Sequence, residues 1–172
     1  MATYNLISTV TVGSGGAASI AFTSIPQTYT DLQLVTSWRT SIASVGDYVV
    51  ISFNSSTSSF SARSLYGTGS ATGSISYPTS PDSRIISQVV GNIATASVFS
   101  SGSLYLPNYT SNNFKSYSTD ATRENNTTGN EMAIQTGLWS DTAAITSIAI
   151  TSWGSATIQQ YSSASLYGIK NS

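Results

Sequence analysis

The side chains that most often carry acid–base or nucleophilic chemistry are scarce in this sequence. Its 172 residues contain no histidine and no cysteine. Without imidazole or thiol groups, Ser-His-Asp triads, Cys-His dyads and most zinc or copper sites are excluded. No Walker-type GxxxxGK[ST] loop is present, and the glycine-rich segment Gly13–Gly16 is not followed by a helix-like pattern. We therefore expect no enzymatic activity and no bound cofactor.

Carboxylate pairs could still hydrolyse glycosides or bind a cation. Nearly all of the acidic residues fall at expected strand ends or in turns, where they cap and solubilise; they are Asp31, Asp47, Asp82, Asp120, Glu124, Glu131 and Asp141. The segment Glu124–Glu131 is dense in the oxygen ligands that calcium prefers, but its spacing does not match an EF-hand loop. We expect an exposed turn there and no metal, with a cation site as the alternative.

Aromatic residues near the ends of expected strands give the remaining candidates for a binding site. Sugar-binding sandwiches offer such rings from strand ends and loops, beside amide and carboxylate groups. Trp139, which is followed by Ser140 and Asp141, fits this pattern, and Tyr109 lies in an expected loop. We take Trp139, Asp141 and Tyr109 as candidates for contact with a partner protein or a glycan. The alternative for each ring is packing at the edge of the core.

The pattern of short apolar runs predicts an all-β fold. Long charged helix formers are nearly absent, with two lysines and two glutamates in the chain. Alternating runs are separated by clusters of Gly, Pro, Asn, Asp and Ser at intervals of about 8–12 residues, which is typical of a sandwich or barrel. We expect one antiparallel β-sandwich domain over residues 1–172. The expected strands are Asn5–Val12, Ala18–Phe22, Asp31–Trp38, Tyr48–Phe53, Phe60–Tyr66, Ala94–Leu106, Phe114–Thr119, Met132–Leu138, Ala144–Trp153 and Ser163–Lys170.

One segment is ambiguous between helix and strand. Asp82–Gly91 has a possible N-cap, apolar residues at 85, 86, 89 and 90, and a terminal glycine, all of which suit a short helix. Its β-branched residues suit a strand equally well.

A four-residue phrase recurs in the chain. SLYG occurs at Ser64–Gly67 and Ser165–Gly168, and the close copy SLYL at Ser103–Leu106. The unequal spacing excludes a repeat architecture, so we expect three core strands in similar environments, with Leu on one face and Tyr on the other. The alternative is a shared ligand site built from Tyr66, Tyr105 and Tyr167.

The low charge limits the possible partners. Charged residues make up 8% of the chain, the net charge is −1, and no basic patch or spanning apolar segment is present, so we expect neither nucleic acid nor membrane as a partner. Monomeric β proteins protect their sheet edges with lysine, proline or other charges. Two lysines cannot protect about ten strands, so we expect permanent assembly with itself or other proteins.

Several phrases in order along the chain resemble those of short virion structural proteins of tailed bacteriophages, especially cyanophages and other aquatic phages. The matching stretches are LISTVTVGSGGAASIAFTSIPQTYTDLQLV, ISFNSS, SLYGTGS, LYLPNYTSNN, GLWSDTAAITSIAIT and SASLYGIK. The resemblance implies a jelly-roll-like β-sandwich without enzymatic activity, often a homotrimer, located in the virion and assembled in the host cytoplasm. The function it implies first is that of a capsid decoration or cement protein bound to the major capsid protein. The alternative is a tail-fibre or head-fibre module that recognises a host-surface glycan.

Overall fold

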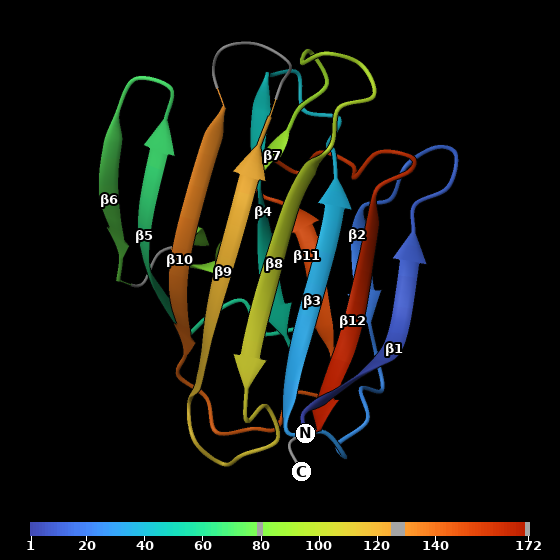
Figure 1. Ribbon diagram of the computed structural model, residues 1–172, viewed down its shortest axis with the longest axis vertical. Helices are drawn as coiled ribbons and strands as arrows, with labels where there is room; N and C mark the ends of the chain where they lie inside the picture. Colours follow the sequence, from blue (N-terminus) through green and yellow to red (C-terminus); the bar gives the residue numbers. More distant parts are fainter. Residues whose placement is uncertain (79–80, 125–129, 171–172) are drawn as a thin grey trace.

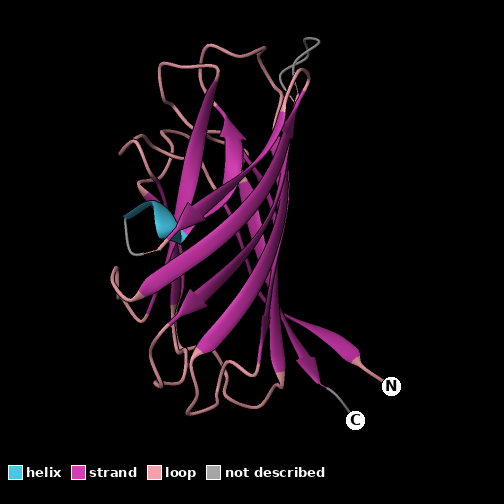
Figure 2. Cartoon of the chain, turned by 90° about the vertical axis from the view of Figure 1, so that its left-hand side faces the viewer, coloured by secondary structure: helices cyan, strands magenta, loops and turns pink. Residues whose placement is uncertain are grey.

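The chain folds into two antiparallel β-sheets packed face to face. The computed structural model describes residues 1–78, 81–124 and 130–170, and in these residues the 3-10 turn Pro81–Arg84 is the only helical segment. Figure 1 shows the larger sheet in front of the smaller one, and Figure 2 shows the two layers from the side. The predicted antiparallel sandwich is confirmed. No helix in the described part of the chain has the length and apolar character needed to cross a membrane.

The larger sheet has eight strands and the smaller one four. In spatial order, the larger sheet contains β1 (Thr3–Thr11), β12 (Ser163–Lys170), β3 (Asp31–Trp38), β8 (Ser100–Pro107), β9 (Lys115–Arg123), β10 (Glu131–Trp139), β5 (Phe60–Thr68) and β6 (Thr72–Tyr77). The smaller sheet contains β2 (Ser19–Phe22), β11 (Ile148–Ser152), β4 (Gly46–Phe53) and β7 (Ile85–Val90).

The strand order is that of a jelly roll enlarged by two hairpins. If the hairpins β5–β6 and β9–β10 are set aside, two four-stranded sheets remain, β1-β12-β3-β8 and β2-β11-β4-β7. Along these eight strands every step crosses from one sheet to the other except β4 to β7, which pair within the smaller sheet, as in jelly-roll sandwiches. Both hairpins extend the same side of the larger sheet, to the left in Figure 1. The jelly-roll expectation therefore holds for the eight central strands.

Strand alternation fills the space between the sheets with apolar side chains. In β3, Leu32, Leu34 and Trp38 are buried, as their period-two spacing predicts. A group of aromatic rings closes one end of this core: Phe53 lies with its centroid 5.7 Å from Phe60, 5.8 Å from Tyr117 and 5.6 Å from Trp139. The pairs that Phe53 forms with Tyr117 and Trp139 are edge-to-face, and such contacts add to the free energy gained by burying the rings.

Burial of Tyr117 predicts a loss of stability at high pH. Its side chain is 2% exposed, and burial raises its pKa well above the ordinary value. Burial also raises the pKa values of Tyr48 and Tyr109. Above about pH 10 the unfolded chain releases these phenol protons while the folded chain keeps them, so the unfolded state is favoured as pH rises.

We expect the urea midpoint to stay constant up to about pH 9.5 and to fall above it. Tyr117 alone should lower the free energy of unfolding by about 1.4 kcal/mol per pH unit in that range. Urea titrations at pH 8, 9, 10 and 11 measure this. Tyr117→Phe should give a shallower decline, and an equally steep decline in that variant would contradict the assignment.

Several strand predictions change in the structure; the run Ala144–Trp153, for example, forms a strand only over Ile148–Ser152. The ambiguous segment Asp82–Gly91 contains the end of the 3-10 turn and strand β7, so the strand alternative is correct from Ile85 onward. Strand β6 was not predicted, because its sequence TGSISY is dominated by small polar residues. The strand expected from Ala94 begins only at Ser100, since the preceding loop turns around the buried side chain of Arg39.

The three copies of the SLY phrase do not share one environment. They lie in β5, β8 and β12, and Leu104 and Leu166 are buried, but Leu65 is 64% exposed. In β5 the buried residues Phe60 and Ala62 show which side chains point inward. Leu65 is an odd number of residues from Phe60, so it must point outward. The expectation of three similar core strands is wrong for this copy. Tyr66 faces inward while Tyr105 and Tyr167 face outward, so the three rings do not form one site.

Candidate functional site

Two of the three sequence candidates for ligand contact lie inside the protein. Trp139 is 1% exposed and packs against Phe53 and Phe60. Tyr109 is fully buried, and its hydroxyl donates a hydrogen bond to the carbonyl oxygen of Pro26. Core packing, the alternative weighed for both rings, explains these positions and leaves neither ring free to meet a glycan or a partner.

Asp141 lies in a turn after β10. Its Oδ1 accepts a hydrogen bond of 2.8 Å from the backbone N–H of Ala143, and the residue is partly exposed. This is the local capping contact that aspartate makes in turns. Asp141 lies at the end of β10 that Trp139 occupies, but the indole is directed into the core.

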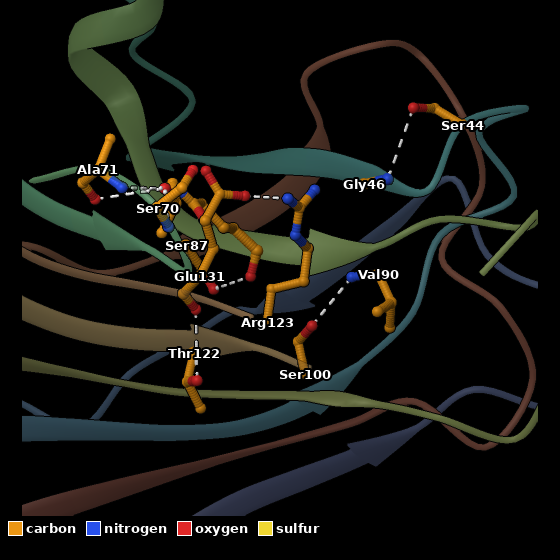
Figure 3. A network of polar contacts seen from close by, with 12 residues as sticks. Ser44, Gly46, Ser70, Ala71, Ser87, Val90, Ser100, Thr122, Arg123 and Glu131 are labelled. Carbon is orange, nitrogen blue, oxygen red and sulfur yellow. Dashed lines mark hydrogen bonds and ion pairs between the residues drawn. The ribbon is translucent and has the colours of Figure 1, made fainter. Parts of the chain in front are cut away.

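The suggested cation-binding segment falls partly outside the described residues, at 125–129. The flanking Glu131 forms an ion pair with Arg123, and both side chains are mostly buried. Figure 3 shows the Arg123 guanidinium between Glu131 and the β4 backbone at Gly46, where a Cβ atom would collide with it. This contact connects the β9–β10 hairpin to the smaller sheet. Elsewhere in the described chain, no three acidic groups gather in a way that could hold a metal ion.

The outer face of the larger sheet is broad and almost uncharged. One row of directly paired residues crosses seven strands, namely Ser165, Val35, Ser103, Asp120, Ile134, Leu65 and Ser74. About half of the outward residues of these strands are Ser or Thr, and most of the others are uncharged. The charged ones on the described strands are Asp31, Arg63 and Asp120. This composition differs from the charged surface usual for a free-standing domain.

The two carboxylates on this face already bond to neighbouring groups. Asp31 is 4% exposed and accepts hydrogen bonds from the Tyr105 hydroxyl at 2.8 Å and the Asn108 N–H at 3.0 Å. Burial, together with the hydrogen bond to Asp31, raises the pKa of Tyr105. Asp120 accepts a hydrogen bond from the hydroxyl of Ser103. Asp31 is therefore buried within the sheet, whereas Asp120 and Arg63 remain exposed, so the face carries few charges for its width.

Three apolar side chains form an exposed group on the added hairpins, which we call the hairpin patch. Leu65 of β5 lies directly opposite Ile134 of β10, and Met132 lies two residues along β10 on the same face. They are 64%, 56% and 58% exposed, respectively. Met132 lies opposite Gly67, which has no side chain to cover it. Contiguous apolar side chains at the surface are characteristic of interaction sites.

Sequence reasoning missed the hairpin patch because the apolar residues of β10 point outward and a polar one points inward. In the run Met132–Leu138, Ile134 would ordinarily point inward and Gln135 outward. Instead Gln135 is 5% exposed and donates a hydrogen bond to the carbonyl oxygen of Ile85. The signal that could have revealed this is Trp139, whose inward direction fixes that of Gly137 and Gln135 through the period of two.

Both edge strands of the larger sheet lack charged side chains. β1 and β6 each pair with a single strand, and neither contains Lys, Arg, Asp or Glu. Tyr4 and Leu6 of β1 are 63% and 57% exposed on the outer face. A bulge between Leu6 and Ser8 is the main irregularity that limits pairing along β1. These edges can accept another strand through main-chain hydrogen bonds.

The outer face, the hairpin patch and the two edges together form a surface suited to adhesion, by apolar burial and by strand pairing. Comparisons with protein-family models, with curated proteins and with solved structures gave no match for this chain.

Proposed function

We propose that this protein is a structural protein of a bacteriophage virion, a capsid decoration protein that stabilises the assembled head through protein–protein contacts. The observation that carries the proposal is the hairpin patch, three apolar side chains more than half exposed on a nearly uncharged face. Burial of such side chains contributes roughly 1.5–3 kcal/mol each. A free-standing domain gains no stability from these exposed side chains, whereas a protein held permanently on a large assembly buries them in the interface.

The mechanism is adhesive. The patch docks on the major capsid protein, and the uncharged edges β1 and β6 allow copies of the chain to join, with a homotrimer as the expected unit. Because the protein binds only the assembled shell, its binding free energy favours that shell over dissociated subunits by mass action. Heads carrying it should therefore open at a higher temperature than heads without it. The order of phrases along the chain, which resembles phage virion proteins, supports the same assignment.

Copy number and head stability test this proposal. In purified particles of the phage that encodes the chain, stained gels are expected to show hundreds of copies, and heads lacking the protein should open at lower temperature. Ile134→Lys should weaken binding to undecorated heads by about 10- to 100-fold, because it removes apolar burial from the patch. Ala21→Lys, at an exposed position on β2 of the smaller sheet, is the matched control. Tens of copies or fewer, or equal binding by both variants, would contradict the proposal.

A further inference from the structure

The jelly-roll topology gathers four loops at one end of the sandwich, the upper end in Figure 1. They are the connections β1–β2, β3–β4, β7–β8 and β11–β12. Residues from all four line an open cavity of about 520 Å³. This volume lies in the ~300–1,000 Å³ range of small-molecule sites, and loops on a rigid scaffold are where binding residues concentrate.

Arg39 belongs to the lining of this cavity and holds one of its walls, the β7–β8 loop, in place. The residue is 5% exposed, and its guanidinium donates hydrogen bonds of 2.6–3.2 Å to the carbonyl oxygens of Asn92, Ala94, Thr95 and Val98. Burial lowers its pKa, as expected for a cation removed from water. Since its donors face these carbonyls, Arg39 orders the β7–β8 loop. The wall that this loop forms is therefore preorganised.

The remaining walls carry neutral hydrogen-bonding groups. The Gln159 amide donates to Oδ1 of Asn92 at 2.9 Å, and the hydroxyls of Thr157 and Ser41 lie 3.0 Å apart. Gln160, Ser97 and a partly exposed Phe99 also belong to the lining, and among the described residues that line the cavity there is no carboxylate and no lysine. Amides and hydroxyls can each donate and accept, as the hydroxyl groups of a sugar require.

Tyr161 presents an aromatic ring at the rim. It is 71% exposed and has a left-handed backbone with φ of 71°, a conformation that bulky residues rarely adopt. Neighbouring contacts enforce this backbone: Tyr161 N–H donates to the Val12 carbonyl at 2.9 Å, and Gln159 N–H donates to the Arg39 carbonyl at 2.8 Å. Enforced strain that exposes a large ring beside a cavity is characteristic of binding sites.

We infer that this cavity binds a neutral carbohydrate, with one face of a sugar ring stacked on Tyr161 and its hydroxyls bonded to Asn92, Gln159 and Gln160. The C–H-rich face of a pyranose matches an aromatic ring, and the amides match its equatorial hydroxyls. An anionic ligand is disfavoured, because the guanidinium of Arg39, the cation in the described lining of the cavity, is directed at backbone carbonyls. The inference does not depend on the capsid proposal, and its test uses the isolated protein.

The test is an array of neutral and sialylated oligosaccharides probed with the full chain, followed by calorimetric titration of the strongest neutral glycan. Tyr161→Gly should weaken that binding at least about tenfold while leaving the fold intact, since glycine tolerates the positive φ without strain. Tyr161→Phe should retain binding. Tyr4→Ala, which removes an exposed tyrosine outside the cavity, is the control and should bind like the parent.

Three results would overturn the inference: no neutral glycan bound on the array, binding confined to sialylated glycans, or unchanged affinity in Tyr161→Gly. Each is separable from failure of the capsid proposal, which is decided on particles.

Discussion

Arg39→Met should lower the free energy of unfolding by about 3–5 kcal/mol. The guanidinium satisfies four carbonyl oxygens of the β7–β8 loop, and hydrogen bonds from a charged donor contribute about 1.5–3 kcal/mol each, though not additively. Methionine keeps much of the apolar stem but provides no donor, so the carbonyls lose their partners and the loop its anchor. Urea denaturation followed by tryptophan fluorescence measures the change, and amide exchange over 91–99 should accelerate.

The control for this substitution is Arg63→Met. Arg63 is exposed on the outer face and contacts the adjacent Ala62 carbonyl at 2.8 Å. Its replacement should change stability by no more than about 0.5 kcal/mol. If both variants unfold at the same urea concentration, the β7–β8 loop does not depend on Arg39, and the preorganised wall of the cavity loses its physical basis.

Trp139→Ala should cost about 3–5 kcal/mol, the usual penalty for removing a buried aromatic side chain. The ring is 1% exposed, crosses Phe53 edge-to-face at 5.6 Å and stacks near Phe60 at 6.3 Å. Its Nε1 is buried without a hydrogen-bond partner among the described residues. Trp139→Phe should therefore cost much less, about 1.5 kcal/mol or below, because it keeps most of the ring contacts and removes the unpaired donor.

Thermal and urea unfolding of both Trp139 variants distinguish the two roles considered for this residue. A core role predicts a large gap between Ala and Phe. A cost below about 1 kcal/mol for Trp139→Ala would place the indole near solvent and restore it as a ligand-contact candidate.

The strands that alternate strictly could be predicted from the sequence almost to the residue. Asp31–Trp38 and Ser163–Lys170 have the predicted bounds, because inward Leu and outward polar residues leave one register available. Prediction failed on the added hairpins, where Leu65 and Ile134 point outward. In β10 a polar residue, Gln135, lies buried on the inner face while Ile134 lies on the outer one, so local hydrophobicity does not determine which face is inside.

The binding surfaces were harder to predict than the strands. Tyr109 and Trp139 were reasonable candidates by type and position, but nothing local to either residue shows that other segments cover it. The cavity at the loop end is assembled from segments as far apart as Gly15 and Tyr161. No short motif encodes such a set; only the crossing of the chain between two sheets brings it together.

The placement of the two inserted hairpins has a geometric consequence. They widen the larger sheet beyond β8, so the hairpin patch lies on the outer face of β5 and β10, whereas the cavity is lined by the four loops of the jelly roll. A copy fixed to a large body through this outer face would still hold its loops clear of that body. Attachment through the outer face and ligand binding at the loops would then be independent, and the loop residues could change in sequence without weakening the attachment.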